Sequence, residues 1–252
     1  MIQENTGQIE IINIVSFLAN RFKGTVFASF LYHWENIIFS LIVALILILL
    51  SLIATRKMAL TPRSRMQNIF EVVIGGIDDF ICSILGPRGR KFTPFIGTIF
   101  IYILFMNLFG LIPFMKSATS NLSVTLSLAL CVFVYVQYTA FKEAGFVGYF
   151  KHMAGDPKGF LGASIIFPVL MFILHTVSEL IKPITLSLRL RSNIWGDDML
   201  LSVLASFGIK GIPLIVFTSL IIIFGAVVQA IVFSLLSTIY FAFVLKHEEK
   251  EE

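Results

Sequence analysis

Apolar residues fill five long runs of this chain, and most charged residues lie in the segments between them. The runs are Asn36–Thr55, Phe92–Met115, Ser117–Phe141, Gly159 to about Met199 with polar interruptions, and Gly211–Leu245. About 20 consecutive apolar residues cross the hydrocarbon core of a bilayer as a helix. The pattern therefore predicts an all-α membrane protein with about five spanning helices, forming a single integral membrane domain over residues 1–252.

The last run is too long for an upright span. Gly211–Leu245 contains 35 residues and no charge. As one helix it would be about 52 Å long at 1.5 Å per residue. A hydrophobic helix longer than the bilayer core is accommodated by tilting. The sequence therefore predicts a strongly tilted or projecting last helix.

Residues 64–84 follow a different pattern, with apolar side chains at helical spacing and polar side chains on the other face. The apolar positions are Met66, Ile69, Phe70, Val73, Ile74, Ile77, Phe80, Ile81 and Ile84, and the polar ones are Gln67, Asn68, Glu71, Asp78 and Asp79. This periodicity predicts an amphipathic helix at the membrane interface. The alternative is a short helix packed against other loops.

Composition and charge support a membrane protein and suggest its orientation. The chain of 252 residues is 57% hydrophobic and only 13% charged, whereas soluble domains are about a quarter charged. Twelve lysines and arginines lie in the loops after the first and third runs and in the tail, against five on the other side. Because cytoplasmic loops are enriched in these residues, residues 1–35 should lie outside and the polar tail 246–252 in the cytoplasm. The two cysteines, Cys82 and Cys131, are far apart and predict no metal site.

The stretch Ser178–Asn193, "SELIKPITLSLRLRSN", places four charges inside the fourth run. A charge at the bilayer centre costs on the order of 3 kcal/mol by insertion scales. On a helix advancing 100° per residue, most polar residues of this run share one stripe about 80° wide. Its members are His175, Glu179, Lys182, Arg189, Asn193 and Asp197.

The two arginines of this stretch are not equivalent. Arg191 is expected on the opposite face from the stripe, where it can snorkel to a headgroup or pair with an acid in a loop. Glu179 and Lys182 are three residues apart and can form a structural ion pair that only holds helices together. Arg189 has no acid three or four residues away on its helix. An intramembrane arginine without such a neighbour suggests a partner on another element or chain.

Guanidinium stays protonated in proteins, so Arg189 cannot relay protons. It can present a fixed positive charge to a carboxylate on another chain and stop ions from passing directly through the site. Glu179, Asp197, Asp198 and His175 can titrate and line an aqueous path. The combination favours an ion-translocating stator.

Three motifs of the chain resemble the subunit a family of F-type ATP synthases, the membrane stator beside the rotating c-ring. "KPITLSLRLRSN" is similar to that family's Lys-Pro-x-Ser-Leu-x-x-Arg-Leu-Phe-Gly-Asn signature. "SNLSVTLSLAL" and "QAIVFSLLSTIYF" are similar to its third-span and last-helix motifs. Order and spacing agree across most of residues 36–245. The resemblance implies a bacterial inner-membrane protein whose region 159–245 forms a helical hairpin facing the c-ring.

The resemblance implies roles for individual residues. Arg189 matches the essential arginine, Asn193 the asparagine after it, and Gln229 the facing glutamine of the last helix. Asp198 matches an acidic residue in one of two half-channels. Ser178 and Lys182 match polar positions that precede the arginine.

This chain departs from the family pattern at several positions. Phe-Gly of the signature is Arg191-Ser192 here, the usual acid of the third span is Asn121, and Ile222 stands where relatives often carry His or Glu. The candidates for taking up and releasing protons in their place are therefore His175, Glu179, Asp197 and Asp198.

The resemblance implies a non-catalytic subunit without a cofactor, nucleic acid or metal ion. Its partners would be the c-ring, the subunit b peripheral stalk and the rest of the synthase. The ion, H⁺ or Na⁺, is set by a c-subunit carboxylate on another chain. Two rival interpretations are a secondary transporter for a small solute, which usually shows two related halves, and a purely structural scaffold.

Overall fold

The computed structural model describes residues 2–5, 8–11, 34–56, 65–112, 115, 117–153 and 166–246. This part of the chain is nearly all helical, which confirms the predicted fold class. Its helices are α3 (Glu35–Thr55), α4 (Arg65–Leu85), α5 (Thr93–Phe109), α6 (Leu122–Met153), α7 (Ile166–Ser206) and α8 (Ile212–Lys246). Short 3-10 turns occur at η1 (Pro87–Lys91), η2 (Ala118–Ser120) and η3 (Gly208–Gly211). Near the amino terminus, β1 (Ile2–Asn5) and β2 (Gln8–Ile11) form an antiparallel pair that the sequence analysis did not predict.

Helices occupy all five predicted span positions within the described ranges. Four stretches are long and apolar enough to cross a membrane: Glu35–Thr55, Leu122–Glu143, Val169–Ser206 and Gly208–Leu245. Helix α5 has 17 residues and is therefore only about 25 Å long. The predicted span Phe92–Met115 was too long, because the chain turns after Phe109. At this turn Gly110 approaches Ser117 so closely that an added Cβ would lie 2.7 Å from the Ser117 Cβ.

The other boundaries differ from the predictions at helix ends. Helix α6 begins at Leu122 rather than Ser117, and the Asn121 Oδ1 atom accepts a hydrogen bond of 2.9 Å from the Ser123 backbone N–H. This is the bond of a helix N-cap. Helix α6 continues beyond Phe141 with a kink at Gly145, whose φ is 68°. Helix α7 continues past Met199 to Ser206, whereas α8 differs from the prediction by one residue at each end.

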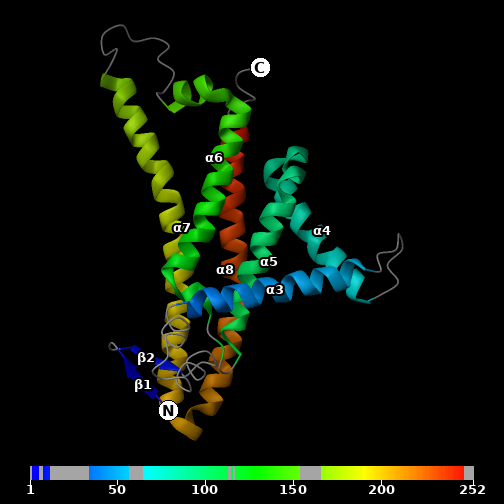
Figure 1. The fold of residues 1–252 in the computed structure, drawn as a ribbon, viewed down its shortest axis with the longest axis vertical. Helices are drawn as coiled ribbons and strands as arrows, with labels where there is room; N and C mark the ends of the chain where they lie inside the picture. The colour runs from blue at the N-terminus through cyan, green and yellow to red at the C-terminus, as the bar shows by residue number, and fades with distance from the viewer. Residues whose placement is uncertain are drawn as a thin grey trace.

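Helices α6, α7 and α8 lie side by side along the long axis of the molecule, and α3 runs across them (Figure 1). Helix α3 is about 31 Å long and so matches the thickness of the hydrocarbon core. Helix α7, with 41 residues, is about 62 Å long. If α3 crosses the bilayer upright, α7 and α8 are strongly inclined within it. The arrangement therefore agrees with the strong tilt that the length of the last run predicts.

The main core joins α4, α5, α6, α7 and α8. It includes Ile81, Ile103, Val136, Leu190 and Phe233, all almost fully buried. The rings of an aromatic group pack together in this core: Phe92, Phe95, Tyr135 and Phe241. The Phe92 and Phe241 rings stack with centroids 4.5 Å apart. Such aromatic pairs add about 0.5–1.5 kcal/mol beyond the burial of their area. The core thus fixes α7 relative to α6 and α8.

The two halves of helix α4 differ in how much of their apolar surface is buried. In its second half Ile77, Phe80 and Ile81 pack against the main core. In its first half Ile69 and Val72 expose 59% and 67% of their surface. The packed half agrees with the alternative in that α4 is packed, but its partners are helices of the main core rather than loops. The exposed half leaves an apolar surface of the kind that an interfacial helix inserts into lipid.

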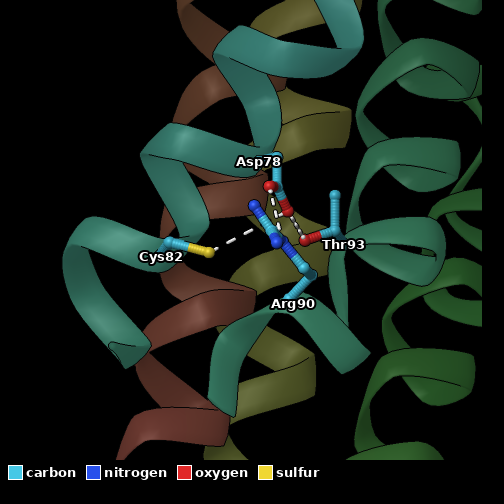
Figure 2. Close-up of polar contacts among 4 residues, drawn as sticks. All are labelled: Asp78, Cys82, Arg90 and Thr93. Atoms are coloured by element: carbon cyan, nitrogen blue, oxygen red, sulfur yellow. Dashed lines mark hydrogen bonds and ion pairs between the residues drawn. The ribbon is translucent and has the colours of Figure 1, made fainter. Parts of the chain in front are cut away.

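Polar contacts anchor the packed half of α4 to the start of α5 (Figure 2). The Thr93 hydroxyl donates a hydrogen bond of 2.7 Å to Asp78 Oδ1, and Arg90 Nε donates one of 3.1 Å to Asp78 Oδ2. The hydrogen bond from the Thr93 hydroxyl is the main cause of the lowered pKa of Asp78. Arg90 also lowers this pKa. Asp78 is therefore a carboxylate at neutral pH and holds the α4–α5 junction through both oxygens. The sequence analysis placed Asp78 on the polar face without predicting this contact.

Candidate ion-translocation site

Arg189 lies on an exposed flank of α7. Within the described part of the chain its guanidinium has no hydrogen-bond or ion-pair partner. Thr185, Ser192 and Gly196, one or two turns away on the same flank, are exposed as well. A Cβ built on Gly196 would meet no atom within 4 Å. The flank of Arg189 is therefore open and lined by small side chains, which allow another helix to approach closely.

Asn193 connects α7 to α8 one turn after Arg189. The Asn193 Nδ2 atom donates a hydrogen bond of 2.7 Å to Gln229 Oε1, and Gln229 is only 3% exposed. The Gln229 Nε2 atom is buried without a hydrogen-bond partner. The family resemblance implies that Gln229 faces this part of α7, and the two amides are in direct contact. We call this contact the amide bridge.

Glu179 lies where α6 and α7 meet. Its Oε2 atom accepts a hydrogen bond of 3.1 Å from Gln137 Nε2 on α6, and its Oε1 atom accepts one from the Lys182 ammonium on its own helix. The Glu179–Lys182 ion pair that the spacing allows is therefore formed. The Lys182 ammonium also lies 5.3 Å from the ring centroid of Tyr240 on α8. This group of four side chains joins three helices.

The remaining candidates lie along both ends of α7. His175 and Ser178 are exposed, and His175 Nδ1 lies 3.0 Å from the Met171 carbonyl oxygen. Asp197 and Asp198 are half-buried within a continuous stretch of α7, so they cap no helix end. Asp198 lies one turn from Ile194 and from Ser202, which are both buried and therefore mark the packed face of α7.

Two departures from the family pattern have clear structural settings. Asn121, at the position of the usual acid, caps α6 through its side-chain oxygen. Ile222 is 5% exposed and belongs to the packed face of α8. An apolar residue suits that position because it needs no hydrogen-bond partner.

Arg191 is half-buried, unlike Arg189, and its Nε atom is buried without a hydrogen-bond partner among the described residues. It lies about 200° around α7 from Arg189. The structure therefore gives the two arginines different surroundings, as the helical spacing predicts.

The polar stripe is divided between two environments. Glu179 and Lys182 contact α6 and α8, whereas Arg189 is exposed and has no hydrogen-bond or ion-pair partner among the described residues. Sequence reasoning missed Gln137 and Tyr240 as members of the Glu179 group. A glutamine inside an otherwise apolar span was the available signal for Gln137, because polar residues at such positions usually hydrogen-bond to another helix.

Comparisons with known proteins identify the family. The family model for the ATP synthase A chain matches residues 37–242. A protein named ATP synthase subunit a from Protochlamydia amoebophila is 39% identical over 252 residues, covering 96% of this chain and 92% of the relative. Relatives of the same name from Aliarcobacter butzleri and Solidesulfovibrio magneticus are 39% and 35% identical, covering 81% and 84% of this chain and 86% and 85% of the relatives. The apolar helices and the extent of these matches show a multi-pass membrane protein that belongs to the ATP synthase A chain family.

Proposed function

We propose that this chain is the ion-translocating stator subunit of an F-type ATP synthase, with Arg189 as the fixed charge that faces a carboxylate of the c-ring. The observation that carries the proposal is the exposed guanidinium, without a hydrogen-bond or ion-pair partner among the described residues, on a helix long and apolar enough to span a membrane. Such a charge costs on the order of 3 kcal/mol in a bilayer. A carboxylate from a partner chain would remove that cost and would remain ionised beside it.

The surface around Arg189 suits a neighbouring helix. Thr185, Ser192 and Gly196 give room for close approach, and large apolar side chains on both α7 and α8 are exposed beside them. We place the c-ring against this surface, with α7 and α8 as the c-ring-facing hairpin. The subunit b stalk and the rest of the synthase complete the complex.

The polar residues on either side of Arg189 are candidates for two half-channels. Asp197, Asp198 and Asn121 are candidates towards the end of α7, and Glu179 and His175 towards its start. Asn193, Gln229, Lys182 and Ser178 support the site as polar neighbours. An ion would enter one half-channel, bind the c-ring, travel with it and leave by the other. A membrane potential supplies ~2.3 kcal/mol per charge per 100 mV for this passage.

The subunit would not itself catalyse ATP synthesis. Its sequence contains no GxxxxGK[ST] phosphate-binding loop. The chemistry would belong to other subunits, and this chain would couple ion flow to rotation.

Copurification and pumping test this function. An affinity-tagged form of the chain, extracted from membranes in mild detergent, should carry the c-ring and the peripheral stalk with it. Vesicles reconstituted with that complex should pump protons on ATP addition, and repeating the assay with Na⁺ varied identifies the coupling ion. Recovery of the chain without a c-ring, in vesicles that take up a small solute, would instead support a transporter.

Side-specific labelling tests the proposed orientation, in which residues 1–35 lie outside, α4 lies at the cytoplasmic interface and the tail lies in the cytoplasm. In a background with Cys82→Ser and Cys131→Ser, cysteines replace Glu4 or Glu252. A membrane-impermeant maleimide should label the Glu4→Cys variant in right-side-out vesicles and the Glu252→Cys variant in inverted ones. Labelling of both from one side would require an even number of spans and would contradict five.

A further inference from the structure

Glu179 is held by donors from two helices and still reaches solvent. Gln137 Nε2 donates to one carboxylate oxygen at 3.1 Å, and the Lys182 ammonium donates to the other. The side chains of Glu179 and Lys182 are each 26% exposed. The carboxylate is therefore fixed in place without being sealed from water.

The opening beside Glu179 is a small pocket between α6, α7 and α8. Glu179, Lys182 and Tyr240 supply its polar atoms, and the other walls are mostly apolar, including Val132, Val136 and Leu186. A pocket with polar groups on an apolar wall can hold water at those groups. Proton transfer requires hydrogen-bond reach, either directly or through one water. A water held in this pocket beside Glu179 would meet that requirement.

The position of Glu179 along α7 separates it from the other carboxylates of the helix. Glu179 precedes Arg189 by ten residues, or about 15 Å along the axis. Asp197 and Asp198 follow Arg189 by about 12–14 Å. Carboxylates thus stand on both sides of the guanidinium, at similar distances. A continuous water-filled path past Arg189 would let ions cross the membrane without turning the c-ring. The carboxylates before and after Arg189 must therefore connect to different faces of the membrane.

We propose that Glu179 is the proton-carrying carboxylate of the half-channel that opens at the start of α7, on the cytoplasmic side, with Gln137 and Lys182 as its positioning residues. This inference rests on the proposed stator function. During synthesis a c-ring carboxylic acid would release its proton to the water of this half-channel, and a water beside Glu179 would then pass a proton to the Glu179 carboxylate. Glu179 would become a neutral acid, and the proton would then pass to cytoplasmic water and restore the carboxylate. No bond other than O–H forms or breaks.

The competing role for Glu179 is a structural ion pair with Lys182, and substitutions separate the two roles. Removing one partner of a partly buried pair is destabilising, whereas removing both is often tolerated. If the pair only holds helices, the double variant Glu179→Gln with Lys182→Met should pump like the wild type. If Glu179 carries protons, that double variant should remain as slow as Glu179→Gln alone, and Glu179→Asp should recover part of the rate.

The assay uses inverted vesicles that contain the complete synthase. Glu179→Gln should lower the initial rate of ATP-driven proton pumping by about tenfold or more, with unchanged c-ring content in detergent extracts. Glu143→Gln, which removes an exposed carboxylate from α6, is the matched control and should pump normally. Normal pumping by Glu179→Gln, or full rescue by the double variant, would overturn the inference.

Thiol access tests the separation of the two half-channels. In the background lacking Cys82 and Cys131, a membrane-impermeant thiol reagent should label a Glu179→Cys synthase only from the cytoplasmic side and an Asp198→Cys synthase only from the outer side, which a gel shift measures without requiring activity. Labelling of both from the same side would overturn the inference. The parent function is tested separately by Arg189→Ala: if that variant loses pumping while Glu179→Gln does not, only the role of Glu179 fails.

Discussion

Replacing Arg189 with alanine should reduce coupled ion transport to background while the complex still assembles. The guanidinium is exposed and has no hydrogen-bond or ion-pair partner in the described part of the chain, so its loss leaves no group of this subunit unpaired. In the proposed mechanism, what is lost is the fixed charge for the c-ring carboxylate and the barrier between the half-channels. ATP-driven proton pumping in inverted vesicles measures the effect, and c-ring content in the same membranes measures assembly.

Arg191→Ala is the matched control for that experiment. The substitution has the same chemistry two residues away, but Arg191 lies about 200° around the helix and is half-buried. We expect this variant to retain most of the pumping activity. Equal loss from both substitutions would contradict the assignment of Arg189 to the c-ring face.

The second large effect is expected from Asp198→Asn. We expect about a tenfold or greater loss of pumping, because a positioned carboxylate typically contributes at least that much to proton transfer. Asp198 lies on the packed face of α7, one turn from the buried Ile194 and Ser202 and about 180° around the helix from Arg189, so a path that reaches it would be separate from the Arg189 flank. Asparagine has a similar shape but cannot carry the proton. The initial pumping rate, with the c-ring still bound, is the measurement.

Asp197→Asn is the control for position. Asp197 lies about 100° from Asp198 and one turn from the exposed Asn193, so its loss should have a smaller effect. Unchanged pumping in Asp198→Asn would place the outer half-channel elsewhere. A larger effect from Asp197→Asn would exchange the roles of the two aspartates.

The long helices α8 and α4 were predictable because the hydrophobic pattern within each segment is enough to indicate a helix. Helix α8 differs from the predicted Gly211–Leu245 by one residue at each end, and α4 covers the predicted amphipathic segment 64–84 with the same small difference. Helix ends were less predictable. The turn after Phe109 depends on the approach of Ser117 to Gly110, and the start of α6 depends on a cap from Asn121. Both are contacts that no apolar run reveals.

The site was predictable in its members on α7 but not in its surroundings. Helical spacing grouped Glu179, Lys182 and Arg189 on one stripe. Their separation into a packed pair and an exposed cation depends on where α6 and α8 lie, which spacing within one helix does not contain. Gln137 and Tyr240 join the Glu179 group for the same reason.

The amide bridge has a consequence for how the subunit keeps its shape while it works. Asn193 and Gln229 have no proton to gain or lose near neutral pH, so their hydrogen bond is equally strong in acidic and alkaline surroundings. The two membrane faces of a working synthase differ in proton concentration, and in the proposed mechanism nearby carboxylates change charge during each passage of an ion. One turn from Arg189, the spacing of α7 and α8 is set by neutral groups. In the proposed mechanism, the bridge would therefore keep the distance between α7 and α8 constant while nearby carboxylates gain and lose protons.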